Sequence, residues 1–301
     1  MARPNFFLVG APKCGTSAVA YYLREHPSVF MSWPKEPLFF CEDFPGARVV
    51  KEWQDYAELF EAAPSDAAVV GEASAMYLYS SVALERIRSH SPDARIIAMV
   101  RSPIELVQAF HAQLLYSLTE DVADLGTAWS LQAARREGRN LPPRCVEPAF
   151  LQYARVGMLG RQIARLYSVF PADQVLVLRL EDLARDARAV YLEVLEFLGV
   201  EDDGRRSFEP VNETSAHKSN LISRLTQRPP ERLVGAARAV KSAIGLKNAS
   251  FLDPIRRLNS RRAVRERLAP AIRRDMVSTF RADVEELSRL LNQDLSHWLE
   301  G

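Results

Sequence analysis

The sequence has little of what marks secreted, membrane-spanning or metal-binding proteins. Its 301 residues include only three cysteines, Cys14, Cys41 and Cys145, whose spacing matches no metal pattern. Three are also too few for a disulfide scaffold, so we expect a reducing compartment and a cytoplasmic protein. No apolar run approaches the ~20 residues of a membrane span, and the apolar stretch near the start is too short for a signal peptide.

The chain also lacks a net charge of one sign, although its charges are unevenly distributed. The formal net charge is +1, and we expect no nucleic-acid partner. Residues 216–275, however, contain fifteen Lys and Arg against four Asp and Glu. Two interpretations stay open for this segment: an amphipathic lid or membrane-surface helix, or a solvated helical face, which we favour for most of it.

Short apolar runs alternate with helical patterns over the first 200 residues. The sequence predicts strands at 5–10, 28–31, 67–70, 95–100 and 174–178, and helices at 16–25, 52–61, 81–89, 105–118, 158–169 and 189–198. This alternation implies crossover connections, so we expect a three-layer α/β fold with a parallel sheet. After Gly199 we expect no strands, but helices at 231–245, 263–280 and 282–291. We interpret 1–301 as one domain, with a core over about 1–200 and a basic loop and helical lid over about 201–301.

The main functional signal is a phosphate-binding loop at residues 10–17 (GAPKCGTS), between the first predicted strand and helix. A glycine-bearing turn there presents backbone N–H groups and a helix N-terminus to an anion. Lys13 adds positive charge, and Thr16 and Ser17 add hydroxyl donors. The alternative is an ordinary turn capped by Thr16, and we favour phosphate binding.

The loop departs from the nucleoside-triphosphatase pattern G-x4-G-K-[ST]. Thr16 follows Gly15 where that pattern has lysine, and no carboxylate follows Arg101 at the end of the fourth predicted strand to hold Mg²⁺. Because a sulfuryl group carries less charge than a terminal phosphoryl group, lysine and backbone donors can suffice without a metal. The departures therefore favour sulfuryl transfer over ATP chemistry.

Five stretches resemble, in order, the sulfotransferases that use 3′-phosphoadenosine 5′-phosphosulfate (PAPS), especially the Golgi glycan type and its bacterial relatives. They are 7–17 (FLVGAPKCGTS), 35–40 (KEPLFF), 71–77 (GEASAMY), 100–105 (VRSPIE) and 283–298. The resemblance implies a metal-independent enzyme that transfers the sulfuryl group to a glycan, lipid or small-metabolite acceptor and releases adenosine 3′,5′-bisphosphate. Ala73 stands where glycan-acting members often carry a basic residue, which argues against a sulfated-polysaccharide acceptor.

The resemblance also assigns roles. Lys13 would bridge the sulfuryl group and the leaving 5′-phosphate, Arg101 would pair with the 3′-phosphate, and Glu36 would be the general base. Ala109 replaces a serine that usually shares the 3′-phosphate, and Ser102 or Gln108 could compensate. The expected donor-binding residues are Pro12, Lys13, Cys14, Gly15, Thr16, Ser17, Arg101, Gln108, Ala109 and Lys218.

Each of the following candidate residues has a functional and a structural interpretation, and both stay open. Glu36 is a base or half of a solvated Lys–Glu pair, and His111 is a second candidate base or a packing residue. Glu72 lines the acceptor pocket or makes a structural hydrogen bond, and it is grouped with Tyr77 and Phe40 as expected substrate residues. Lys218 contacts phosphate or lies exposed in a loop, and Cys14 is a reactive thiolate or a small residue that fits the turn.

Two functional alternatives stay open. A P-loop kinase or nucleotide hydrolase would need Mg²⁺ and a carboxylate at a strand end. A non-catalytic nucleotide-binding protein of the same fold would bind the donor or its product without turnover. Replacement of Glu36 separates this second alternative from an enzyme, because only an enzyme would lose rate while keeping donor affinity.

Overall fold

The computed structural model describes residues 3–65, 67–209, 215–217, 260–262 and 268–300. Within them, parallel strands form one sheet in the order β2-β3-β1-β4-β5. The strands are β1 (Phe6–Gly10), β2 (Val29–Met31), β3 (Val69–Ala73), β4 (Arg95–Val100) and β5 (Val175–Arg179). The expected α/β fold with a parallel sheet is confirmed, and β1 is buried along its whole length, as its continuous apolar sequence predicts.

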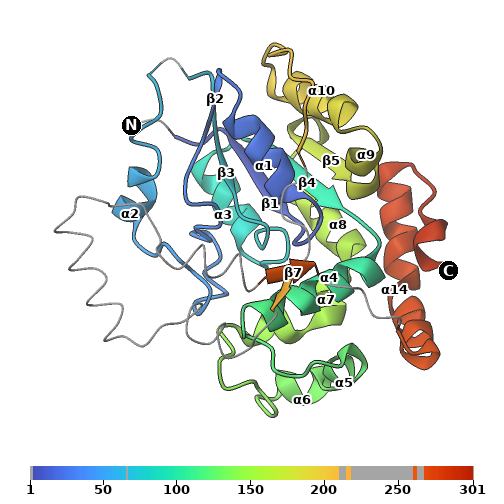
Figure 1. Cartoon of the computed structure of the whole chain (residues 1–301). Coiled ribbons are helices and arrows are strands. Elements are labelled where there is room, and N and C mark those ends of the chain that lie inside the picture. The colour runs from blue at the N-terminus through green and yellow to red at the C-terminus, as the bar shows by residue number, and fades with distance from the viewer. Residues whose placement is uncertain (1–2, 66, 210–214, 218–259, 263–267, 301) are drawn as a thin grey trace.

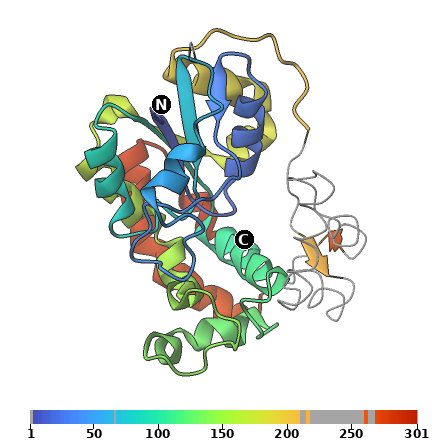
Figure 2. The same ribbon diagram turned by 90° about the vertical axis from the view of Figure 1, so that its left-hand side faces the viewer.

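Helices cover both faces of the sheet (Figures 1 and 2). The helices α1 (Thr16–Arg24), α9 (Leu180–Arg185) and α10 (Ala187–Leu198) lie on one face, whereas α3 (Ala83–His90), α8 (Leu159–Val169) and α14 (Pro270–Leu291) lie on the other. The remaining helices are α2 (Trp53–Glu58), α4 (Pro103–Tyr116), α5 (Leu125–Ser130), α6 (Gln132–Arg136) and α7 (Tyr153–Gly157), with 3-10 turns at Pro148–Leu151, Ala172–Gln174 and Ser296–Leu299.

The part after residue 199 corrects two expectations. A short antiparallel pair, β6 (Ser215–His217) with β7 (Ser260–Arg262), occurs where no further strands were predicted, and β6 lies beside α4. The two helices expected at 263–280 and 282–291 are one helix, α14, because nothing in its sequence breaks the turn between them. The predicted helix at 231–245 and most of the basic segment 216–275 lie outside the described residues.

A carboxylate anchors α14 to the sheet's helical layer. Asp283 is buried on α14, and its two oxygens accept from the backbone N–H groups of Gly160 (2.7 Å) and Arg161 (3.0 Å) in the first turn of α8. These N–H groups have no intrahelical partner, so the carboxylate satisfies them. Its negative charge is in turn stabilised by the positive end of the helix dipole. A Cβ on Gly160 would lie 2.2 Å from the Asp283 carbonyl oxygen, so only glycine fits this contact.

A fully buried ion pair holds the α5–α6 segment against α7. Arg135 makes two hydrogen bonds to Glu120, of 2.6 and 2.8 Å, and both side chains are 0% exposed. The hydroxyl of Tyr153 on α7 also donates to Glu120 at 2.6 Å. Burial of both charges is tolerated because every oxygen of the carboxylate is hydrogen-bonded.

We predict that Arg135→Ala lowers the free energy of unfolding by about 3–5 kcal/mol, because it leaves the buried Glu120 carboxylate without its counter-charge. Arg139→Ala is the matched control, since Arg139 pairs with Glu137 on the exposed surface and should change stability by less than about 1 kcal/mol. Urea unfolding of both variants measures the difference. Equal losses in the two variants would contradict the assignment.

Candidate functional site

The loops after β1 and β4 meet at the carboxyl edge of the sheet, where ligands bind in open α/β folds. The Ala11 N–H donates to the Met99 carbonyl at 2.7 Å, and the Arg101 Nη1 donates to the Lys13 carbonyl at 3.0 Å. These two bonds join the predicted phosphate loop to the predicted arginine, which are about 90 residues apart in the chain.

The phosphate loop has the backbone geometry that its glycines predict. Gly15, at φ +94°, precedes α1, and a Cβ there would lie 2.8 Å from Leu180 Cδ1. Gly10 has φ +148°, and a Cβ there would lie 2.5 Å from the Ala75 carbonyl oxygen. Lys13 adopts the left-handed conformation at φ +61° without being glycine. Such strain persists where the surroundings fix it, here through the bond from Arg101.

Three cations converge on this loop. The Lys35 Nζ approaches the Thr16 hydroxyl at 3.5 Å, and burial together with the nearby Arg101 and Lys35 lowers the pKa of Lys13. Lys35 pairs with Glu36 and Arg101 pairs with Glu105, whereas Lys13 donates to the neutral amide of Gln113 at 3.3 Å. The site therefore holds an excess of positive charge around Lys13, next to the unpaired N–H groups at the start of α1.

The loop after β2 brings Glu36 to the same place. Its backbone N–H donates to the Ala73 carbonyl at 2.9 Å, and its Oε2 accepts from the Ala75 N–H at 2.8 Å. Its Oε1 pairs with Lys35, and the side chain is partly exposed. Segment 71–77 thus orients the carboxylate that was predicted as the base, and Lys35 links it to the phosphate loop.

Arg101 is more buried than expected for a residue predicted to pair with the 3′-phosphate. The residue is 8% exposed, its guanidinium is bonded to Lys13 and Glu105, and its Nε is buried without a hydrogen-bond partner. A phosphate that reached this guanidinium would share it with Glu105 and the Lys13 carbonyl. Ser102, considered as a compensating donor, instead gives its hydroxyl to the Trp298 carbonyl at 3.2 Å.

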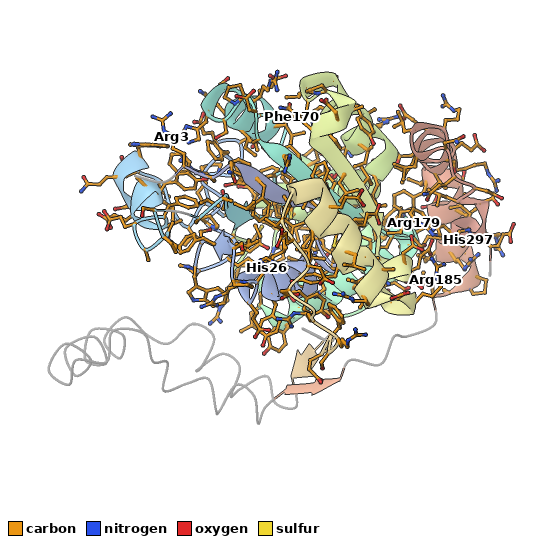
Figure 3. All side chains as sticks on the ribbon, turned by 90° about the horizontal axis from the view of Figure 1, so that it is seen from above. Arg3, His26, Phe170, Arg179, Arg185 and His297 are labelled. Atoms are coloured by element: carbon orange, nitrogen blue, oxygen red, sulfur yellow. The ribbon has the colours of Figure 1, made fainter. Side chains whose placement is uncertain are left out.

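The end of the chain packs beside this turn. The Trp298 Nε1 donates to Glu181 at 3.1 Å, and Arg179 binds Asp182 at 2.6 Å at the end of β5. Arg179, Arg185 and His297 gather at this side of the molecule (Figure 3). The described contacts of Ser102 and Trp298 therefore support the turn that carries Arg101.

Several predicted residues lie away from the loop. His111 is buried, its Nε2 bonds the Val122 carbonyl at 2.9 Å, and its ring packs against Tyr153. It is two residues from Gln113, so helical geometry places it on the opposite side of α4 from the residue that contacts Lys13. The prediction of a catalytic His111 is therefore corrected to a packing role.

Two further predictions change in the same way. Burial raises the pKa of Cys14 to about 12, so the thiol is not a reactive thiolate and serves as a small residue in the turn. All three cysteines are unpaired thiols. Of the α4 residues, Ala109 is buried and Gln108 is half-buried, while Lys218 lies outside the described residues. Pro12, Lys13, Cys14 and Gly15 form the loop, and Thr16 and Ser17 begin α1. Arg101 contacts this loop directly, and Glu36 is linked to it through Lys35.

The expected substrate residues Glu72, Tyr77 and Phe40 belong to the core behind the loop. Glu72 and Tyr77 are 0% exposed and Phe40 is 5% exposed. Phe40 packs edge-on against Phe7 and Tyr77. Glu72 makes structural hydrogen bonds, as one of its two interpretations expected, and none of the three side chains is exposed at the surface of the site.

Sequence reasoning missed Gln113, which contacts Lys13. It lies four residues after Ala109, one turn further along the same face of α4. Helical spacing from Ala109 would have found it, whereas a search for the usual serine position could not.

Comparisons with known proteins identify the family. The sulfotransferase domain family matches residues 3–221. The chain belongs to the sulfotransferase family. A sulfotransferase structure from Alicyclobacillus acidocaldarius is 25% identical, with a TM-score of 0.70 over 99% of both chains. Mouse sulfotransferase SULT7A1, solved in complex with PAP, shares the fold at 14% identity, with a TM-score of 0.51 over 97% of this chain and 88% of that one.

Two human relatives of this chain carry carbohydrate names. Carbohydrate sulfotransferase 15 is 26% identical over 65% of this chain and 44% of its own length. Bifunctional heparan sulfate N-deacetylase/N-sulfotransferase 3 is 28% identical over 65% of this chain and 22% of its own length. The chain thus spans less than half the length of these relatives. Within the described residues, no helix is long and apolar enough to cross a membrane.

We predict a stability difference that reports on Glu72. Burial raises its pKa from 4.5 to about 7, so between these pH values the folded protein holds a proton that the unfolded chain has released. The free energy of unfolding therefore falls as pH rises through this window, by about 3 kcal/mol relative to Glu72→Gln, which cannot titrate. Urea unfolding of both proteins at pH 4.5 and pH 8 measures this. Parallel pH dependences would contradict it.

Proposed function

We propose that this sulfotransferase uses PAPS as donor and transfers its sulfuryl group to an acceptor hydroxyl or amine without a metal. The observation that carries the proposal is the position of Lys13, which has a neutral partner, beside the N-terminus of α1 and two further cations. Such a site fits the 5′-phosphosulfate, because negative charge grows on the leaving phosphate as the S–O bond breaks.

Glu36 is the base in this mechanism. The acceptor oxygen or nitrogen attacks sulfur in line, the bond from sulfur to the 5′-phosphate oxygen breaks, and Glu36 takes the acceptor proton. Ala75 and Lys35 each bind one of its oxygens, which leaves lone pairs available for that proton. Adenosine 3′,5′-bisphosphate then leaves, with Lys13 and the N–H groups of α1 offsetting its charge.

We would test carbohydrates first as acceptors, because of the names of the two relatives. Both curated relatives are named for carbohydrate or heparan sulfate chemistry, although Ala73 lacks the basic side chain expected of glycan-acting members. The kinase or hydrolase interpretation is not favoured by the family match. The cytoplasmic location and the membrane-surface contact of segment 216–275 stay predictions.

Donor binding is the first test. We expect adenosine 3′,5′-bisphosphate to bind without Mg²⁺ in calorimetric titration, and ATP to bind more weakly or not at all. Lys13→Ala should weaken binding by about 10- to 100-fold, since a hydrogen bond from a charged group contributes about 1.5–3 kcal/mol. Lys51→Ala, an exposed lysine, is the control and should bind as the wild type does. Binding of ATP alone, and only with Mg²⁺, would overturn the proposal.

Turnover is the second test. Glu36→Gln should lower the rate of [³⁵S]sulfuryl transfer from PAPS by ~10²-fold or more, because it removes the base, while the affinity for adenosine 3′,5′-bisphosphate is unchanged. Transfer is followed with oligosaccharides that offer hydroxyl and amine acceptors, and with phenols. A wild-type protein that binds the bisphosphate but never turns over would favour the non-catalytic alternative.

A further inference from the structure

A buried carboxylate behind the site has only hydroxyl partners in the described contacts. Glu72 on β3 is 0% exposed and accepts from Ser74 Oγ at 2.6 Å, Tyr56 OH at 2.8 Å and Tyr77 OH at 3.0 Å. A carboxylate that is ionised can only accept, so all three hydroxyl protons point toward it. The carboxylate therefore fixes the direction in which each hydroxyl presents its lone pairs.

Two of these hydroxyls also accept hydrogen bonds from the loop that carries Glu36. The Leu38 N–H donates to Ser74 Oγ at 3.2 Å, and the Phe40 N–H donates to Tyr77 OH at 3.4 Å. With its own proton directed at Glu72, each hydroxyl presents its lone pairs to the loop N–H. The bond from Tyr56, in contrast, ends at Glu72 and makes no described hydrogen bond to the loop.

The loop needs such support because its backbone is strained. Glu36 has φ +65° and Leu38 has φ +53°, left-handed values that cost energy for residues other than glycine. The loop is tied to segment 73–77 at residues 36, 38 and 40. These ties select the one conformation in which the Glu36 carboxylate accepts from the Ala75 N–H.

We propose that Glu72 is a positioning residue for the base: by orienting the hydroxyls of Ser74 and Tyr77, it holds the 36–40 loop in its strained conformation and aims Glu36 at the donor loop. The catalytic part of this proposal rests on the proposed function, in which Glu36 is the base. The structural part, the coupling of Glu72 to the loop, does not.

The protonation state of Glu72 determines whether all three hydroxyl protons point toward it. Burial raises its pKa to about 7, the three hydroxyls oppose that rise, and the nearby Glu36 adds to it. The titratable groups that face it are Tyr56 from α2, Tyr77 from the turn after β3, and Glu36 and Cys41 from the segment after β2. A protonated Glu72 donates to one of its three hydroxyls, so that hydroxyl directs its own proton away from Glu72. When that hydroxyl belongs to Tyr77 or Ser74, its lone pairs are no longer held toward the loop and its bond to the loop weakens.

Amide hydrogen exchange of the full chain tests the structural part. Tyr77→Phe should speed exchange of the Phe40 amide about tenfold, and Ser74→Ala should do so for Leu38. Glu72→Gln should do so for at least one of the two amides, because its side-chain nitrogen donates where a carboxylate oxygen accepted. Tyr56→Phe is the matched control, because it removes a hydroxyl from the same carboxylate oxygen and should leave both amides protected. In the wild type, protection of at least one of the two amides should decrease as the pH falls through about 7, and Glu72→Gln should lack this dependence.

Sulfate release from [³⁵S]PAPS, with water as acceptor and enzyme in excess, tests the catalytic part. Glu72→Gln and Tyr77→Phe should lower this rate about tenfold with unchanged affinity for adenosine 3′,5′-bisphosphate, while Tyr56→Phe stays within twofold. Unchanged exchange and rate in both Glu72→Gln and Tyr77→Phe would overturn the proposal. A wild type that neither binds the bisphosphate nor releases sulfate would overturn the proposed function instead, and exchange would still decide the coupling.

Discussion

Lys13 stands in a left-handed turn, and Arg101 holds it there from the end of the neighbouring strand. The rest of the site follows from this contact. It fixes the direction of the lysine side chain, sets the start of α1, and joins the two loops at the centre of the sheet. Because the turn stores strain, it depends on packing from β1 and β4, and these strands are among the most buried parts of the chain.

The strands and main helices were predictable because they are short, apolar and regularly alternating. β4 was predicted at its observed bounds, and β1 within one residue. The short helices α5, α6, α7 and α9 were missed, since five or six residues give little periodicity to detect. The pair β6–β7 was missed for a related reason: its partners are three residues long and more than 40 positions apart.

Some residues of the site could be predicted from sequence motifs, whereas others depend on contacts between elements. Residues 12–17, Glu36 and Arg101 occupy fixed positions in motifs, so the sequence was enough to name them. Gln113 follows from helical spacing once Ala109 is placed on the site face of α4, whereas the hydroxyls around Glu72 depend on which side chains face each other across elements, which no spacing rule encodes. His111 was misassigned because its distance from Arg101 along the helix was known, but not the face on which it lies.

The pairing of Arg101 with Glu105 bears on how donor binding responds to salt. Arg101 and Lys35 are already paired with Glu105 and Glu36, so their charges are largely offset before an anion arrives. Lys13 alone of the three has a neutral partner. Screening by ions should therefore weaken binding as expected for about one uncompensated cation, and the site would remain usable over a broad range of ionic strength.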